Sequence, residues 1–325
     1  MKKVRKRSRY SGRKYERYKK GYWKRYWKQR KQRFQRTICN LKLRLEKRPD
    51  PYPVREAGTR GRPPMPPKAV LVALMVKVLL DLSYLDTESF PRWASNDGLL
   101  VVVPAASTMQ EHTADIPEEY LQDLMMDVAS ALDKGGLTII LDATSLSTEQ
   151  YGRWRSVRFR SRKIKRKYVK VHLSIDLKTK GILIGLASKG WKGDNRFGLR
   201  MMKKVKRMIK VFGVEILKAL TDAGYLSRDM ATMIEDLGGT PFIKIRKNTT
   251  AKAAGHPSWK RMVRRQKNDP HGFKAVHCYR VVVEGVISAL KRLFGHTVAS
   301  KKRHNQNVEV PCRLILWNYG RVDLA

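Results

Sequence analysis

Three acidic residues stand where a fold can use them for chemistry. Asp142 follows the apolar, β-rich run 137–141, Asp222 ends the mainly apolar run 216–221, and Glu284 lies inside the apolar segment 279–294. A carboxylate at the end of a buried strand faces solvent, and such positions often carry functional residues. Taken singly, either Asp is better explained as a turn residue or a helix cap. Taken together, the three acids predict one site for a divalent metal ion.

The elements expected from residue 135 onward would bring these acids together. The pattern predicts helices at 195–212, 226–237 and 279–294, the last being the final strong helix, and strands at 137–142, 168–176, 181–188, 215–222 and 241–246. Hairpin strands followed by strand–helix–strand units predict an α/β fold, a mixed five-stranded sheet flanked by helices. In such a sheet the first and fourth strands are neighbours, so Asp142 and Asp222 are expected side by side at one edge.

The segment 279–294 places basic residues around its acid. Arg280, Glu284 and Lys291 are spaced by four and seven residues, which puts them on one face of a helix. Glu284 could then lean over the strand ends while its basic neighbours flank it. The β-branched triplet 281–283 leaves a second interpretation open, in which the segment begins as a strand and this shared face is lost.

Composition divides the residues before 135 into three parts. Residues 1–48 alternate Lys and Arg with aromatic residues, residues 49–67 are rich in Pro and Gly, and the remainder contains three expected helices, at 68–82, from residue 86, and at 117–132. We therefore expect four regions: a basic aromatic arm (1–48), a linker (49–67), a small helical domain (68–134) and the domain that contains the sheet (135–320).

The charge of the chain indicates a polyanionic partner. The 325 residues include 70 Lys and Arg against 28 Asp and Glu, a formal net charge of +42. Such an excess repels itself in a compact fold, and nucleic acid is the leading candidate to neutralise it. An anionic membrane is the competing candidate, but no apolar run reaches the roughly 18 residues needed to span a bilayer. Three cysteines without paired spacing argue against a disulfide framework or a Cys-based zinc site, and favour a reducing cytoplasm.

Two basic segments are candidates for contact with nucleic acid. In the arm 1–48, cations can neutralise phosphates while aromatic rings stack on bases; the alternative is a disordered basic tail or a nuclear-type address tract. The stretch 151–170 mixes aromatic and basic residues and is expected to track DNA, although a solvated loop remains the alternative. Its candidate residues are Arg153, Arg155, Arg158, Lys165 and Arg166. Asp194, which begins the helix after the third strand, is expected to be its N-cap.

With these residues in place, the sequence resembles a known group, the DDE transposases of the related IS4 and IS5 insertion sequences. Their third motif is Tyr, two residues, Arg, three residues, Glu, six residues, Lys, and Arg280, Glu284 and Lys291 match that spacing. The position expected to be Tyr is His277, with Tyr279 two residues later. Residues 61–84 also resemble the segment that opens the N-terminal helical domain of these transposases. The resemblance covers roughly residues 58–320 and implies an RNase H-like catalytic core.

The resemblance implies a metal-dependent DNA transposase that cuts at the ends of its element and joins the 3′ ends to target DNA. Asp142 would share two Mg²⁺ ions about 4 Å apart, with Mn²⁺ a possible substitute, while Asp222 and Glu284 each hold one. Arg280, Lys291 and Tyr279 would contact DNA beside the scissile bond. A homodimer on double-stranded DNA, no membrane partner and a cytoplasmic, nucleoid-associated location are also expected. The alternatives are an RNase H-like endonuclease or resolvase that does not join DNA, and a catalytically silent descendant that only binds nucleic acid.

Overall fold

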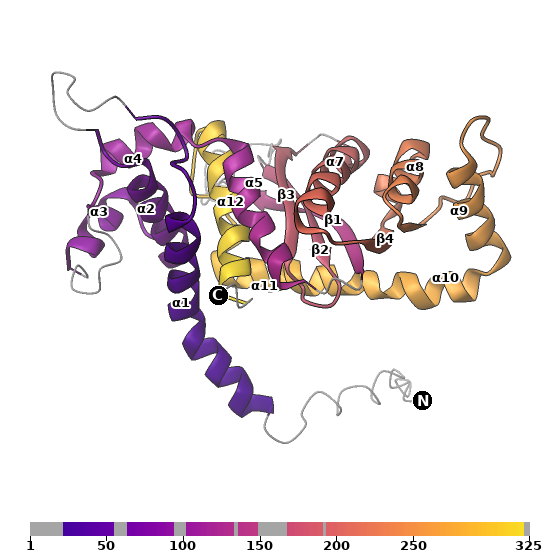
Figure 1. Ribbon diagram of the computed structural model, residues 1–325, viewed down its shortest axis with the longest axis horizontal. Coiled ribbons are helices and arrows are strands. Elements are labelled where there is room, and N and C mark those ends of the chain that lie inside the picture. Colours follow the sequence, from indigo (N-terminus) through magenta and orange to yellow (C-terminus); the bar gives the residue numbers. More distant parts are fainter. Residues whose placement is uncertain are drawn as a thin grey trace, which may run out of the picture.

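A mixed β-sheet forms the centre of the structure (Figure 1). The computed structural model describes residues 22–54, 64–93, 102–132, 136–148, 168–190 and 193–321. Within them, five strands lie in the order β3-β2-β1-β4-β5. The strands are β1 (Leu137–Ser147), β2 (Tyr168–Asp176), β3 (Ile182–Lys189), β4 (Ile216–Thr221) and β5 (Thr240–Ile243). The first three pair antiparallel, whereas β4 is parallel to both β1 and β5. The α/β fold with a mixed five-stranded sheet expected from the sequence is confirmed.

The first strand is longer than the sequence suggested. It was expected to end at Asp142, but β1 continues to Ser147 because β2 pairs with it along that whole length. On its other side, the ladder with β4 stops where Leu141 lies beside Thr221. Residues 139–141 are therefore buried between two strands, and residues 142–144 become half-buried. Asp142 is not a strand end, but it stands where the sheet loses one neighbour and opens.

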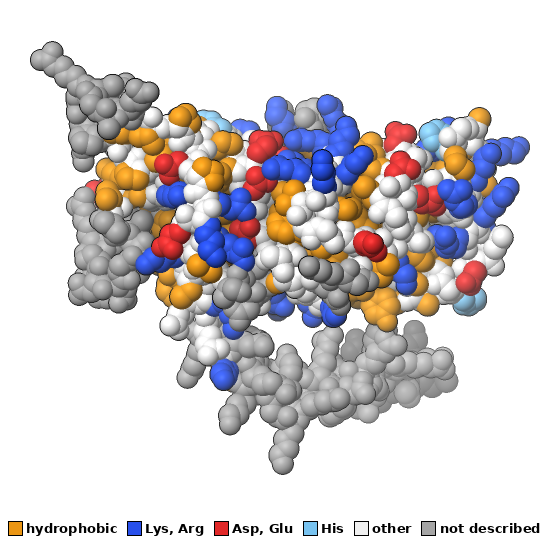
Figure 2. Space-filling view, in the orientation of Figure 1, with side chains coloured by type: hydrophobic (Ala, Val, Ile, Leu, Met, Phe, Trp, Pro, Cys, Tyr) orange, Lys and Arg blue, Asp and Glu red, His pale blue; other side chains and the backbone are white. Residues whose placement is uncertain are grey.

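Helices cover both faces of the sheet. They are α1 (Tyr22–Glu46), α2 (Pro67–Leu80), α3 (Tyr84–Trp93), α4 (Ala106–His112), α5 (Glu118–Met126), α7 (Asp194–Phe212), α8 (Arg228–Asp236), α9 (Pro257–Asn268), α10 (Pro270–His277), α11 (Val281–Phe294) and α12 (Arg303–Tyr319). Of these, α7 packs on β2 and β3, α11 on β1, and both α5 and α12 on β3. Figure 2 shows Lys and Arg side chains gathered over α7. No helix in the described part of the chain has the length and apolar composition needed to cross a bilayer.

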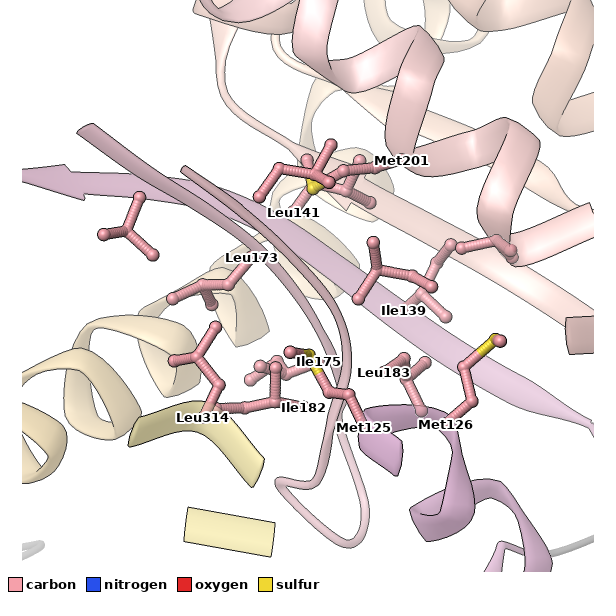
Figure 3. Packing of buried hydrophobic residues seen from close by; sticks show 14 of the residues in the cluster. Met125, Met126, Ile139, Leu141, Leu173, Ile175, Ile182, Leu183, Met201 and Leu314 are labelled. Carbon is pink, nitrogen blue, oxygen red and sulfur yellow. The ribbon is translucent and has the colours of Figure 1, made fainter. Parts of the chain in front are cut away.

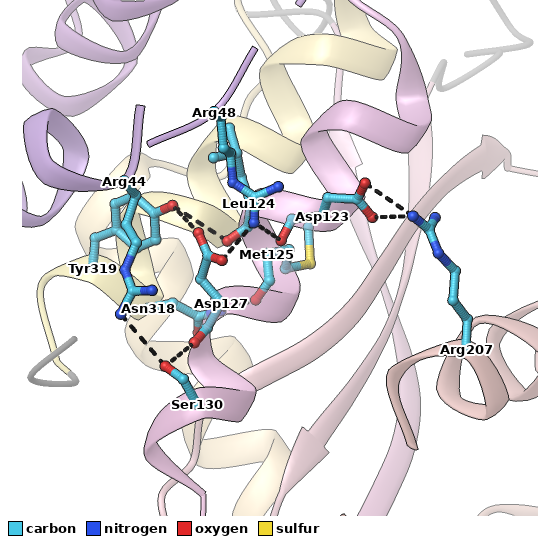
Figure 4. Close-up of polar contacts among 10 residues, drawn as sticks. All are labelled: Arg44, Arg48, Asp123, Leu124, Met125, Asp127, Ser130, Arg207, Asn318 and Tyr319. Atoms are coloured by element: carbon cyan, nitrogen blue, oxygen red, sulfur yellow. Dashed lines mark hydrogen bonds and ion pairs between the residues drawn. The ribbon is translucent and has the colours of Figure 1, made fainter. Parts of the chain in front are cut away.

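The expectation that 279–294 is the final helix is wrong, because α12 follows it and is buried along most of its length. Polar residues in this helix made its sequence look exposed. In the fold, these residues form hydrogen bonds within the protein. The Asn318 amide donates to the carbonyls of Met125 and Ile182, and its oxygen accepts from the Ile182 amide. Figure 4 shows the neighbouring contacts, in which Asp127 accepts from Tyr319 at 2.9 Å. The core helix α12 thus joins the sheet to the N-terminal helices.

One apolar core runs from the N-terminal helices through the sheet (Figure 3). Met125 and Met126 of α5 lie with the strand residues Ile175 and Leu183 in this core. Gly185 on β3 lets Leu314 of α12 approach so closely that any side chain there would collide with it. Residues 22–46 of the arm form α1, which buries Leu41 and Leu45 near its end. The division into regions 1–48, 49–67, 68–134 and 135–320 remains a prediction.

Candidate active site

Two of the three acids lie on neighbouring strands. The last pair of the β1–β4 ladder is Leu141 beside Thr221, so Asp142 and Asp222 are the next residues on parallel, adjacent chains. Asp222 keeps an extended backbone and caps the single turn η5 (Ala223–Tyr225). Both acids are half-buried. The sheet therefore brings Asp142 and Asp222 to the same edge, as the strand order predicted.

The third acid reaches this edge from α11. The segment forms a helix from Val281 onward, so the alternative of an initial strand is wrong. Arg280, at the helix boundary, donates from Nη1 to Asp142 Oδ2 at 2.8 Å and from Nη2 to Glu284 Oε1 at 3.1 Å. One guanidinium thus bridges the strand acid and the helix acid. The four-residue spacing of Arg280 and Glu284 places the two side chains within hydrogen-bonding distance of each other.

An open pocket of about 370 Å³ lies between β1 and α11. Its acidic side is Asp142 and Glu284, and Lys291 lines it from the same helix. Its other lining residues are Ala143, Thr144, Ile287, Ser288, Arg292 and His296. Arg292 and His296 were not predicted as site residues. The only sequence signal for Arg292 was its place next to Lys291, near the end of the helix. Asp222 lies outside this lining, beside Asp142 at the sheet edge.

The surroundings of Asp142 raise the pKa of its carboxyl group, because the positive charge nearby does not compensate for burial and for the two neighbouring acids. Burial raises its pKa most, and the nearby charges of Asp222 and Glu284 raise it further. The Ala143 amide, which donates at 2.8 Å, and the Arg280 guanidinium lower the pKa but do not outweigh these effects. A cation placed among the three acids would relieve this repulsion.

The donor set suits a hard cation, although the acids do not yet converge. In the described ranges, no three His, Cys, Asp or Glu side chains come close enough together to hold one metal ion. Arg280 bonds to both Asp142 and Glu284, so its guanidinium stands where a cation would otherwise bind these two carboxylates. Carboxylate oxygens are the ligands that Mg²⁺ and Mn²⁺ prefer, so the residues fit such an ion once Arg280 releases them.

The two candidates for the Tyr position of the motif have different environments. His277 donates from Nε2 to the Thr221 carbonyl at 3.0 Å and stacks on Phe273, with ring centroids 5.2 Å apart. Burial lowers the pKa of His277, which keeps this imidazole neutral at neutral pH. Tyr279 is 54% exposed beside Arg280. His277 therefore supports the end of β4, and Tyr279 is the aromatic residue of the two that is free to meet DNA.

The other residues singled out in the sequence are the basic residues of the stretch 151–170 and Asp194. Arg153, Arg155, Arg158, Lys165 and Arg166 lie outside the described residues. The expectation that Asp194 is an N-cap is wrong, because Gly193 takes that position and Asp194 is the first residue of α7. Its carboxylate turns back to the sheet and pairs with Lys170 Nζ at 2.5 Å.

Comparison with known proteins places this geometry in context. The family model described as a transposase DDE domain matches residues 133–319, which is more than half of the chain. No protein with a curated description matches the chain in sequence. A solved structure with some similarity is the cryo-EM structure of a piggyBac transposase synaptic complex with hairpin DNA. It is 12% identical, with 88% of this chain and 71% of that chain covered and a TM-score of 0.35.

Proposed function

This chain belongs to the transposase DDE domain family, and on that premise we propose that it cuts DNA at the ends of its own mobile element and joins the 3′ ends to target DNA in a reaction that needs Mg²⁺. The observation that carries the proposal is the bridge from Arg280 to Asp142 and Glu284, at the edge where Asp222 follows β4. These residues come from three distant parts of the sequence and meet at one opening of the sheet.

The acids would hold the metal ions. When bound, two Mg²⁺ ions supply an activated water or 3′-hydroxyl and stabilise the leaving oxygen. Asp142 lies between the other two acids, on the strand that neighbours β4 and packs against α11, so it is suited to be shared. Asp222 and Glu284 would each hold one side of the site. Mn²⁺ is proposed as a substitute because it accepts the same oxygen ligands.

The basic residues would hold the DNA. Lys291 faces the pocket from α11, and we add Arg292 and His296, which line the same pocket. Once the acids bind a metal ion, Arg280 is free to neutralise a phosphate next to the scissile bond. Tyr279 can pack against an exposed base or sugar because its ring is open to solvent. The partner would be double-stranded DNA, bound by a homodimer because two ends must be processed, in the cytoplasm and associated with the nucleoid.

The test is Mg²⁺-dependent nicking and joining of a labelled duplex that carries the terminal repeats of the element. Asp142→Asn, Asp222→Asn and Glu284→Gln should each lower both rates by at least about a thousandfold, a loss of roughly 4 kcal/mol of transition-state stabilisation. DNA binding should persist, since the cationic residues are unchanged. Glu235→Gln is the matched control, because Glu235 pairs with Arg261 on the surface away from the site.

Three outcomes would contradict the proposal. Cleavage without joining would favour the endonuclease alternative. DNA binding by every protein with cleavage by none would favour a catalytically silent descendant. Full activity in any one of the three acid variants would remove that acid from the site.

A further inference from the structure

A second polar cluster lies behind the acids, on the opposite face of the sheet. Asp142 pairs with Leu173, and Leu173 lines an apolar crevice under α11 and α12. The next residue, His172, therefore points the other way. There its ring stacks on Phe197 of α7, with ring centroids 4.4 Å apart and an angle of 7° between the ring planes. His172 is fully buried, so its two nitrogens need partners within the protein.

Both nitrogens of His172 have polar partners within the protein. Burial lowers the pKa of His172 to about 4, so at neutral pH its ring has one donor and one acceptor. Nε2 lies 2.9 Å from Ser188 Oγ, which itself donates to the Lys189 carbonyl. Nδ1 lies 3.5 Å from the Tyr225 hydroxyl. Burial raises the pKa of Tyr225, so this hydroxyl keeps its proton.

Asp194 completes the cluster from the first turn of α7. It pairs with Lys170 and lies 3.5 Å from His172 Nδ1. Gly224, in the turn η5, faces the carboxylate of Asp194, and a Cβ on Gly224 would come within 3.1 Å of Asp194 Oδ2. Gly198 of α7 similarly admits the Tyr225 ring, because a Cβ there would lie 2.8 Å from Tyr225 Cδ1. The two glycines let α7 and the turn η5 pack at very short range.

This turn is the one that follows Asp222. The Tyr225 amide donates to the Asp222 carbonyl at 3.1 Å, and Tyr225 is only 1% exposed. On the other side of Asp222, His277 and the Lys244 amide both donate to the Thr221 carbonyl. The backbone of Asp222 is therefore fixed from both directions. His172 also lies opposite Ala143 in the β1–β2 ladder, one residue from Asp142, so the cluster is tied to both strand acids.

We propose that His172, Asp194 and Tyr225 are positioning residues, which hold the turn after Asp222 so that its carboxylate and that of Asp142 meet at the metal site. The proposal rests on the function proposed above. Metal ligands need placement within about 0.5 Å, and groups that orient a ligand typically change metal affinity or activity by 10- to 100-fold when they are removed. No residue of the cluster needs to touch DNA or metal for this effect.

The experiment compares two buried tyrosines. Tyr225→Phe removes the hydroxyl that bonds to His172 and keeps the ring. Tyr319→Phe is the matched control, because Tyr319 is also fully buried and its hydroxyl bonds to Asp127, remote from Asp222. Mn²⁺ binding to the full chain without DNA is followed by electron paramagnetic resonance, cleavage rates are measured against DNA and Mn²⁺ concentration, and urea unfolding monitors stability.

We expect Tyr225→Phe to bind Mn²⁺ 10- to 100-fold more weakly and to lower kcat, with KM for DNA unchanged. Tyr319→Phe should lose stability but keep wild-type metal affinity. Asp194→Asn, which removes the charge paired with Lys170, should reproduce the metal defect and gives a second test if Tyr225→Phe fails to fold. Wild-type Mn²⁺ affinity and kcat in Tyr225→Phe or Asp194→Asn, or an equal metal defect in Tyr319→Phe, would overturn the proposal.

Failure of the positioning role and failure of the proposed function give different results. If the wild type binds Mn²⁺ and cuts DNA while Asp222→Asn does neither, a normal Tyr225→Phe refutes the positioning role alone. If Asp222→Asn binds Mn²⁺ as tightly as the wild type, the metal site itself is misassigned, and the positioning role falls with it.

Discussion

Two Glu–Arg pairs, each four residues apart on a helix, have opposite surroundings in this protein. On α11, Arg280 bonds to Glu284 at 3.1 Å, and the two side chains are 22% and 56% exposed. On α12, Glu309 bonds to Arg313 at 2.6 Å, and these side chains are 6% and 7% exposed. The spacing and the residue types are the same and only the order of acid and base is reversed, which does not by itself show which pair is buried. Their other partners do.

The α12 pair is completed in the sense that its acid is fully hydrogen-bonded, whereas Arg313 Nε is buried without a hydrogen-bond partner among the described residues. Glu309 accepts hydrogen bonds from the backbone amides of Ala299 and Ser300 at 3.0 and 2.8 Å, and Arg313 donates to the Thr297 carbonyl at 2.6 Å. Burial raises the pKa of Glu309, but Arg313 and these hydrogen bonds outweigh it and hold the pKa below its usual value. The pair fixes the segment 295–300, and His296 in that segment lines the active-site pocket.

The α11 pair is incomplete. Arg280 must serve Glu284 and Asp142 at once, and the pKa of Asp142 stays above its usual value. A fold that can fully satisfy Glu309 leaves Asp142 uncompensated, and such carboxylates mark functional sites. The comparison therefore separates an acid that builds the pocket from acids that are available to a ligand.

The largest expected effect is on the completed pair. Glu309→Gln leaves Arg313 buried without its counter-charge, so we expect the free energy of unfolding to fall by about 3–5 kcal/mol. Glu284→Gln breaks an exposed pair and should cost no more than about 1 kcal/mol. Urea unfolding of both variants measures the difference. Equal losses of unfolding free energy would show that the two pairs contribute equally to stability.

The next effect is on the rate of the proposed reaction. Arg280→Gln removes the cation that we propose neutralises a phosphate next to the scissile bond, and charged hydrogen bonds are worth about 1.5–3 kcal/mol, so DNA cleavage should fall roughly 10- to 100-fold. Stability should change little, because the pair on α11 is partly exposed. Arg261→Gln, which breaks the surface pair with Glu235, is the control for activity. A cleavage rate within twofold of the wild type would mean that Arg280 has no part in the reaction.

A smaller effect should appear on changing pH. The folded-state pKa of Glu309 is lowered, so its stabilising effect is fully present above the unfolded-state pKa of about 4.3 and is lost as the pH falls through the folded value. The stability difference between wild type and Glu309→Gln should therefore be constant from pH 7 to 5 and shrink in more acidic solution. Urea midpoints at several pH values measure it. A difference that grows on acidification would reverse the assigned sign.

The positions of the three acids could be predicted from the sequence better than the frame around them, by which we mean the buried polar residues and helices that support the site. Strand order follows from hydrophobic pattern and short connections, so the neighbouring positions of Asp142 and Asp222 were predictable. The spacing of Arg280 and Glu284 predicted their shared face, and α11 forms despite its β-branched start. These features depend on local pattern and on a few general rules of topology.

The frame depends on contacts between distant residues. Asn318 and Arg313 look like surface residues in the sequence, yet both are buried and bonded to carbonyls that no local pattern identifies. This is why α12 was missed. Likewise, the motif spacing placed His277 at the position expected to be Tyr, and only the fold shows that its ring bonds to the Thr221 carbonyl. Only the folded chain shows which polar residues are already satisfied.

The smallest expected effect tests the incomplete pair by its stability. Because the pKa of Asp142 is raised, its surroundings favour the uncharged form, which the amide of Asp142→Asn imitates. We expect unfolding free energy to be unchanged or up to about 1 kcal/mol higher, as is common when an active-site charge is removed. Asp127→Asn is the matched control, since Asp127 is buried with both Arg48 and Tyr319 as partners and should lose stability. If Asp142→Asn were destabilised as much as Asp127→Asn, Asp142 would be a structural acid like Glu309, and the fold would not be holding it for a ligand.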